Sequence, residues 1–209
     1  MIQRTYNQYC GVARALDLVG ERWALLIVRE LVLGPKRFTD LREGLPGIAT
    51  NVLSQRLRQL ERNGIVTRRR LPPPAASTVY ELTEDGQELV PIMLDLGRWG
   101  ARRMGTRAPE QALRAEWLAV ALKAFFDPRA AKRVRAKIDL RLGEAQFLVE
   151  VDRGRLAIVP GRNGPVDLTV VAEPETLVAY LNGMPVELEA EGDRELLARL
   201  PELFAFGAG

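Results

Sequence analysis

The stretch Thr50-Asn51-Val52-Leu53-Ser54-Gln55-Arg56-Leu57-Arg58-Gln59-Leu60-Glu61-Arg62 has the period of an amphipathic helix. At about 100° per residue, Leu53, Leu57 and Leu60 share one apolar stripe. The opposite face is polar and holds no acid; it carries Asn51, Ser54, Gln55, Arg58 and Arg62. Amides, hydroxyls and arginines of this kind bind base edges and phosphates in a major groove. The stretch therefore predicts a DNA-recognition helix.

Within this helix the roles of the polar residues differ. We expect base reading from Asn51, Ser54, Gln55 and Arg58, whereas Arg56 points away from that face and is expected to be structural. Thr50 is predicted to be the N-cap, because its hydroxyl can accept a hydrogen bond from a free backbone N–H. The alternative is an ordinary solvated helix face, although such a face more often mixes Lys with Glu.

The residues before this helix fit a helix-turn-helix. Helical spacing predicts a short first helix over 9–19 and a central, almost wholly apolar helix over 23–33, which Gly34-Pro35 ends. A third short helix is predicted over 36–45, followed by a turn at Pro46-Gly47-Ile48. A helix, a tight turn with glycine and a polar-faced helix form the helix-turn-helix pattern.

The residues after the helix predict a two-stranded wing. Residues 65–70 and 78–83 have the alternation of strands, and the tip between them contains Pro72-Pro73-Pro74. Three consecutive arginines lead into the tip, where DNA phosphates would supply the opposite charge. The alternative is a solvated arginine run on an exposed strand. The predicted backbone and wing contacts are Lys36, Arg37, Thr39, Thr50, Arg62, Arg68, Arg69 and Arg70.

A longer helix is expected from Thr83, a hydroxyl cap, to about Met104. This helix carries more apolar residues than the core of one small domain needs: Leu89, Ile92, Met93, Leu96 and Trp99. Together with the first helix, this stripe predicts a two-fold homodimer surface.

Composition narrows the class of protein. The 209-residue chain has one cysteine, Cys10, and no histidine, which removes the commonest general base and zinc ligand. No enzyme, metal site or cofactor is therefore expected. Residues 1–107 carry a net charge of +6 and residues 108–209 carry −3, so a polyanionic partner is expected to meet the first half. The absence of an apolar segment of membrane length and of a signal peptide favours the cytoplasm.

The segment 9–104 resembles the HxlR-type winged helix-turn-helix regulators. The resemblance rests on Leu16-Asp17-Leu18-Val19-Gly20-Glu21-Arg22-Trp23, Arg37-Phe38-Thr39-Asp40-Leu41, Leu45-Pro46-Gly47-Ile48, Leu53 to Glu61 and Tyr80-Glu81-Leu82-Thr83. It implies a bacterial transcriptional regulator that binds palindromic operator DNA as a homodimer through its first and last helices. Gly11 stands where the family usually has proline, and Asn51 where lysine is common, so the resemblance gives no operator sequence.

Cys10 matches the redox-sensing cysteine of some members of that family. At the start of a helix its thiolate is favoured by the helix dipole, and Arg14 lies one turn later. Oxidation or alkylation here would change the dimer and release DNA. The alternative is a small buried residue at a helix interface.

Residues 105–112 have the character of a linker. Beyond them, from Val134 onward, apolar residues alternate with a two-residue period. Residues 113–209 predict an α+β domain: a helix over 113–126, five strands beginning near 134, 145, 156, 166 and 186, and helices over 173–183 and 194–204. The order of elements in about 113–206 resembles the sterol carrier protein-like domain. That resemblance implies an apolar cavity for lipids or other hydrophobic molecules, which the short segment before Val186 is expected to shrink or close.

The candidate walls of such a pocket are aromatic: Trp117, Phe125, Phe147, Tyr180 and Phe204. Each is also compatible with plain core packing. Two functions follow from these patterns. One is a transcriptional regulator whose second domain senses a small hydrophobic ligand; the other is a hydrophobic-ligand carrier whose first domain serves dimerisation or protein contact.

Overall fold

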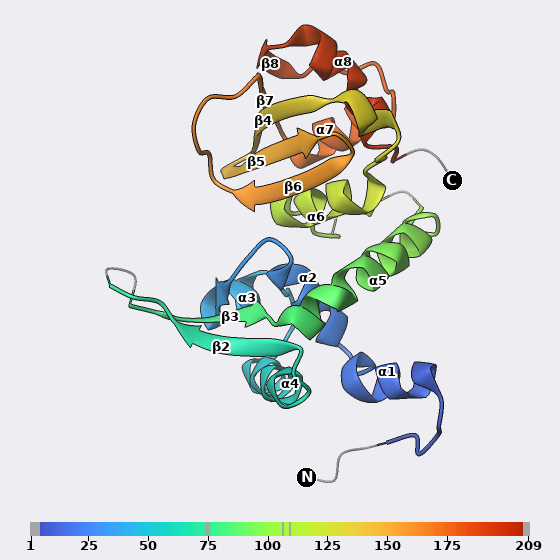
Figure 1. Ribbon diagram of the computed structural model, residues 1–209, viewed down its shortest axis with the longest axis vertical. Coiled ribbons are helices and arrows are strands. Elements are labelled where there is room, and N and C mark those ends of the chain that lie inside the picture. Colours follow the sequence, from blue (N-terminus) through green and yellow to red (C-terminus); the bar gives the residue numbers. More distant parts are fainter. Residues whose placement is uncertain (1–4, 74–75, 106, 109, 207–209) are drawn as a thin grey trace. The chain divides into compact units, whose positions relative to one another are not determined.

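The structure is a computed structural model that describes residues 5–73, 76–105, 107–108 and 110–206. The chain forms two compact units, Met1–Met93 and Leu94–Gly209. One helix, α5 (Glu84–Ala101), begins in the first unit and ends in the second (Figure 1). Thr106 and Pro109 of the predicted linker lie outside the described residues.

Four helices make the first unit's helical core: α1 (Gly11–Val19), α2 (Ala24–Leu31), α3 (Phe38–Glu43) and α4 (Thr50–Arg62). Leucines of α4 supply much of this core, and they are the three that share its predicted apolar stripe: Leu53, Leu57 and Leu60. They pack with buried side chains of α2 and α3, among them Ile27, Leu31 and Leu41. The predicted helix-turn-helix is therefore confirmed, with α3 and α4 as its two helices.

The wing consists of β2 (Val66–Arg70) and β3 (Thr78–Leu82), paired antiparallel with Arg68 opposite Tyr80. A third strand, β1 (Lys36–Arg37), pairs with the other edge of β3. The prediction that Lys36 and Arg37 begin a helix was wrong. The helix starts at Phe38, because the Asp40 carboxylate accepts the backbone N–H of Arg37 at 2.9 Å and fixes the first turn there. Pro74 of the predicted tip lies outside the described residues.

The start of α5 is held against the wing. The Thr83 hydroxyl accepts the backbone N–H of Gly86 at 3.1 Å, which confirms the predicted cap, and it also donates to the carbonyl of Gly64. Gly86 is buried, and a Cβ at this position would lie 2.1 Å from the Ile65 carbonyl oxygen. Only glycine therefore allows α5 to approach the chain so closely where it enters β2.

The second unit is a five-stranded mixed sheet with helices. Its strands are β4 (Arg135–Leu142), β5 (Ala145–Asp152), β6 (Arg155–Pro160), β7 (Leu168–Ala172) and β8 (Glu189–Gly192), in the order β6-β5-β4-β7-β8. β4 and β7 run parallel, and the other neighbours are antiparallel. The fifth strand begins three residues later than predicted, at Glu189 instead of Val186. Its position follows the pairing of Val170 with Ala190, which puts Glu189 and Glu191 beside β7.

Helices α6 (Ala115–Phe125), α7 (Pro174–Leu181) and α8 (Arg194–Leu203) complete this unit, with a 3₁₀ turn, η1 (Ala130–Arg133), before β4 (Figure 1). Side chains of all three helices meet one face of the sheet around a void of about 20 Å³, lined by Leu122, Ile138, Leu140, Val149, Val170, Leu177, Leu181, Leu200 and Phe204. A void of this size holds about one water molecule. It offers no room for a lipid, so the sterol carrier protein-like identity of this unit stays a prediction.

Candidate DNA-binding surface

The polar face of α4 turns away from the core, as its sequence predicts. Asn51 and Arg58 are exposed, while Ser54 and Gln55 are half-buried. Among the described residues, the side chains of Asn51, Ser54 and Arg58 have no hydrogen-bond or ion-pair partner. A helix whose buried leucines fix its position and whose outer donors are unused is suited to reading base edges.

The predicted cap of α4 was wrong. Ala49 is the N-cap, with the extended angles φ −74° and ψ 143°, and its carbonyl already accepts the backbone N–H of Leu53 at 3.0 Å. Thr50 is the first helical residue, and no side chain caps this end of the helix. The Thr50 hydroxyl is therefore free to face solvent, beside backbone N–H groups and the positive end of the helix dipole.

The Arg56 side chain makes structural contacts, as the sequence predicts. Its guanidinium forms an ion pair with Glu21 at 2.8 Å and donates to Gln59 Oε1 at 2.8 Å and to the carbonyl of Arg22 at 3.3 Å. At the C-terminal end of α4, the Asn63 amide donates to the carbonyl of Leu18 at 2.8 Å. These contacts tie the middle of α4 to the segment that joins α1 to α2, and the end of α4 to the last turn of α1.

Two of the predicted backbone contacts already have protein partners. The Lys36 ammonium lies 2.7 Å from Glu30 Oε2, and Arg29 binds the other oxygen of the same carboxylate at 2.8 Å. Glu30 is only 2% exposed, and these two cations offset the cost of burying its carboxylate. Arg37 donates to the Ser77 hydroxyl at 3.1 Å. Sequence reasoning missed this buried acid, although a glutamate within the apolar stretch 23–33 was a signal for it.

The remaining predicted backbone residue of α3, Thr39, donates its hydroxyl to Asp40 Oδ1 at 3.2 Å and is exposed. Arg62, in the last turn of α4, is also exposed. Neither side chain is buried, so both stay available to a phosphate at the edge of the helix.

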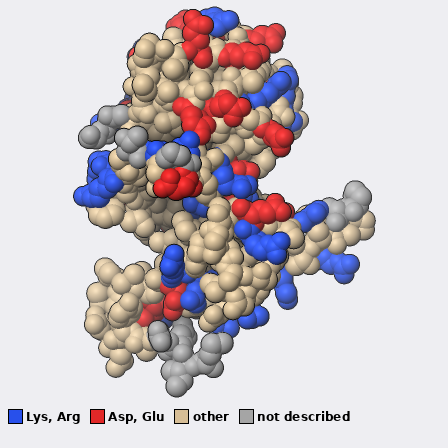
Figure 2. All heavy atoms as spheres, turned by 180° about the vertical axis from the view of Figure 1, so that it is seen from behind, with Lys and Arg blue, Asp and Glu red and all other residues tan. Residues whose placement is uncertain are grey.

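The three wing arginines are not equivalent. Arg69 forms a two-pronged pair with Glu81, with both nitrogen-oxygen distances at 2.8 Å, and this pairing lowers the pKa of the Glu81 carboxyl. Arg68 lies 3.9 Å from Glu61, and Arg70 has no side-chain partner among the described residues. Figure 2 draws one face of the molecule. On this face Lys and Arg side chains flank the wing, and Asp and Glu side chains gather over the second unit. Arg68 and Arg70 are therefore better placed than Arg69 to neutralise phosphates.

We expect Glu81→Gln to raise the affinity for random duplex DNA about twofold to tenfold and to steepen its salt dependence by about one ion, because it frees Arg69 and removes a repelling charge. Fluorescence anisotropy titrations at several salt concentrations measure this. Glu88→Gln, the same charge change at an exposed position of α5, serves as the control. An equal gain in both variants would show that only net charge matters.

Cys10 is exposed at the N-cap of α1. The backbone N–H groups of Ala13 and Val12 lower the pKa of its thiol. The helix end itself thus favours the thiolate, the reactive form of cysteine, and Arg14 is not among the causes.

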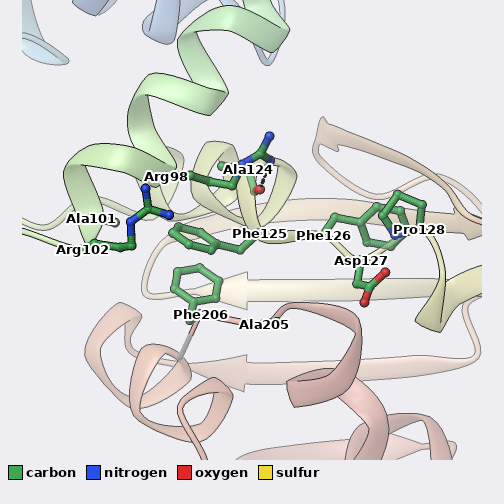
Figure 3. A pocket seen from close by; sticks show the side chains of 10 residues that line it. All are labelled: Arg98, Ala101, Arg102, Ala124, Phe125, Phe126, Asp127, Pro128, Ala205 and Phe206. Atoms are coloured by element: carbon green, nitrogen blue, oxygen red, sulfur yellow. Dashed lines mark hydrogen bonds between the residues drawn. The ribbon is translucent and has the colours of Figure 1, made fainter. Parts of the chain in front are cut away.

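The predicted ligand-pocket residues do not come together. Phe147 is 2% exposed in the sheet core, Phe204 borders the small void, and the Tyr180 hydroxyl donates to the carbonyl of Leu197 at 3.0 Å. Trp117 is half-buried on α6. Phe125 alone of the five lines a larger cleft, of about 520 Å³, in the second unit (Figure 3).

Within the described ranges, no cluster of three or more Cys, Asp or Glu side chains is arranged to hold a metal ion. The described helices include none with the length and apolar character needed to cross a membrane.

Comparison with known proteins places the first unit in a family. The model of the HxlR-like helix-turn-helix family matches residues 18–108. The regulator YvaP of Bacillus subtilis is 37% identical over 86 residues, which are 41% of this chain and 80% of that protein. YodB of the same organism is 40% identical over 85 residues, 41% of this chain and 76% of that protein.

A longer relative, the HTH-type regulator Mb3122 of Mycobacterium bovis, is 44% identical over 90 residues, 43% of this chain and 56% of that protein. Among solved structures, the redox regulator HypR in its oxidized form matches with a TM-score of 0.43 and 34% identity, over 47% of this chain and 99% of that chain. These relatives are named as HTH-type transcriptional regulators. The chain belongs to the HxlR-like helix-turn-helix family of bacterial transcriptional regulators.

Proposed function

We propose that this regulator binds palindromic operator DNA as a homodimer in the cytoplasm, with α4 in the major groove and the wing on the backbone. The observation that carries the proposal is the outer face of α4. Its donors at Asn51, Ser54 and Arg58 are unused within the described residues, while Arg56 holds the helix in place. Residues 1–104 would serve DNA binding and dimerisation, and residues 105–112 would link them to the second domain.

Exposed apolar side chains support the homodimer. On α5, Ile92, Leu96 and Trp99 follow at intervals of four and three residues and therefore share one face of the helix. They are 64%, 49% and 52% exposed. Val12 and Leu16 are exposed on α1 in the same way. Apolar groups that line one helix face are typical of a surface that another protein covers. A second copy of the chain would bring two recognition helices to the two halves of a palindrome.

A salt titration tests the proposal. The full chain should bind a palindromic duplex selected from random sequences at least about a thousandfold more tightly than a scrambled duplex at moderate salt. The affinity should also fall steeply with added salt as counterions are released. Binding that ignores sequence and salt would refute DNA regulation and leave the carrier interpretation.

For Cys10 we propose a role in sensing oxidants or electrophiles. Because the pKa of its thiol is lowered, alkylation by iodoacetamide should reach half of its maximal rate at a lower pH than for a free cysteine peptide. In the wild type, diamide should weaken operator binding about tenfold or more, whereas Cys10→Ser should bind equally with and without diamide. Equal responses of the two proteins would exclude the sensor role.

The second unit we propose as a sensor of a small ligand. The void of about 20 Å³ between its sheet and helices does not favour a lipid carrier, but the cleft of about 520 Å³ has the size of a small-molecule site.

A further inference from the structure

The cleft lies where three segments of the second unit meet. Its lining comes from the end of α5 and the next residue (Arg98, Ala101 and Arg102), from the end of α6 and the residues after it (Ala124 to Pro128), and from Ala205-Phe206 after α8. Backbone hydrogen bonds hold its floor: Ala205 N–H donates to the Phe125 carbonyl at 3.0 Å, and Asp127 N–H to the Leu203 carbonyl at 2.9 Å. The walls are therefore built on fixed backbone.

One part of the lining is aromatic. The Phe125 and Phe206 rings stack with their centroids 4.6 Å apart and an interplanar angle of 27°. Figure 3 shows the two rings facing one another, with the Phe126 ring farther along the cleft, beside Pro128. All three side chains are only half-buried, so they still present apolar surface to the cleft. Such surface suits a flat apolar group.

The charges of the lining are uneven. Figure 3 shows the side chain of Arg102, the residue after α5, directed toward the Phe125 ring. Among the described residues this guanidinium has no hydrogen-bond or ion-pair partner. Arg98 lies beside it, donates to the carbonyl of Ala124 and pairs with Asp95. The acid of the lining, Asp127, sits at the opposite end, where its Oδ1 accepts the N–H groups of Arg129 at 2.7 Å and Ala130 at 3.3 Å.

We propose that this cleft binds a small aromatic carboxylate, with the ring against Phe125 and Phe206 and the carboxylate on the Arg102 guanidinium. The Arg102 guanidinium is planar, has no partner among the described residues and lies beside exposed aromatic rings. Such a group can bind a carboxylate through two N–H groups while the rings contact the apolar part of the same ligand. A neutral hydrophobic ligand would leave that charge unused. The site differs from the sheet-helix interior, which the sterol carrier resemblance would have implied.

The regulatory part of this inference rests on the proposed function. The first half of α5 belongs to the first unit, where Gly86 and Met93 are buried; its last turn supplies Arg98 to the cleft, and Arg102 follows directly after it. If the end of α5 adopts two conformations and only one of them allows the dimer to bind DNA, a ligand that prefers one conformation changes the fraction of dimers able to bind DNA.

The test uses the full chain with 2-naphthoate as the probe and 2-naphthamide, its neutral isostere, as the matched control ligand. Isothermal titration calorimetry is expected to show naphthoate bound about tenfold or more tightly than the amide. Arg102→Gln should abolish that preference, and Arg133→Gln, the same change at an exposed site outside the cleft, should keep it. Phe206→Ala should weaken both ligands alike.

Equal binding of naphthoate and naphthamide, no binding of naphthoate at millimolar concentration, or equal effects of Arg102→Gln and Arg133→Gln would overturn the ligand class. Because no DNA is present in these titrations, their result does not depend on whether the protein binds an operator. Anisotropy with operator DNA then tests regulation: naphthoate should change the wild-type affinity about fivefold or more and leave that of Arg102→Gln unchanged. An unchanged wild-type affinity would overturn the regulatory part.

Discussion

Leu96→Asp is expected to convert the regulator to a monomer and to lower its affinity for a palindromic operator by about two orders of magnitude or more. The aspartate would place a charge in the middle of the apolar stripe of Ile92, Leu96 and Trp99, where a partner copy has to exclude water. Once the two copies separate, each has to bind its half-site independently, and the increase in affinity that comes from linking two binding events is lost. Sedimentation equilibrium gives the mass, and anisotropy gives the affinity.

Leu96 is half exposed, so the substitution should leave the fold intact, and the thermal unfolding of the variant checks this. Val159→Asp introduces the same charge at an exposed apolar residue of β6 and should stay dimeric. A Leu96→Asp protein that keeps the wild-type mass would show that α5 is not the dimer interface. If wild type itself is a monomer, the homodimer proposal fails.

The second large effect is expected for Arg58→Ala. This side chain is exposed at the centre of α4 and has no partner among the described residues, so the protein loses no internal contact when it is removed. If Arg58 binds a guanine edge, the preferred operator should lose about 1–3 kcal/mol of binding free energy, and discrimination at one base-pair position should relax.

Arg70→Ala in the wing is the matched comparison. A phosphate contact carries no sequence information, so this variant should weaken all duplexes similarly and reduce the salt slope by about one. Competition titrations with single-base operator variants separate the two behaviours. If Arg58→Ala weakens random DNA as much as the operator, Arg58 contacts the backbone instead.

The sequence predicted the DNA-binding unit well because its signals are local. The leucine spacing of 53, 57 and 60 decides which face of α4 is buried, and Asn63-Gly64 ends that helix with Gly64 at φ +74°. The role of Arg56 followed from the same periodicity. Where prediction was wrong, two local signals competed. Thr50 is a good cap by residue type, but the extended Ala49 closes the turn one residue earlier.

Other features could not be predicted because they join distant residues. Glu30 with Lys36, and Arg69 with Glu81, pair across strands or turns whose register the sequence does not give. The position of β8 depends on its pairing with β7 and not on its own alternation. The cleft combines α5, α6 and the C-terminal segment, so its lining of Phe125, Phe206 and Arg102 has no signature in any one stretch.

Gly86 has a consequence for how this family member can evolve. A side chain there would overlap the Ile65 carbonyl, so the junction of wing and α5 is fixed by steric exclusion and not by side-chain chemistry. The outer face of α5 takes no part in that exclusion. Its residues can therefore be substituted while the close approach of α5 to the chain that enters β2 stays unchanged.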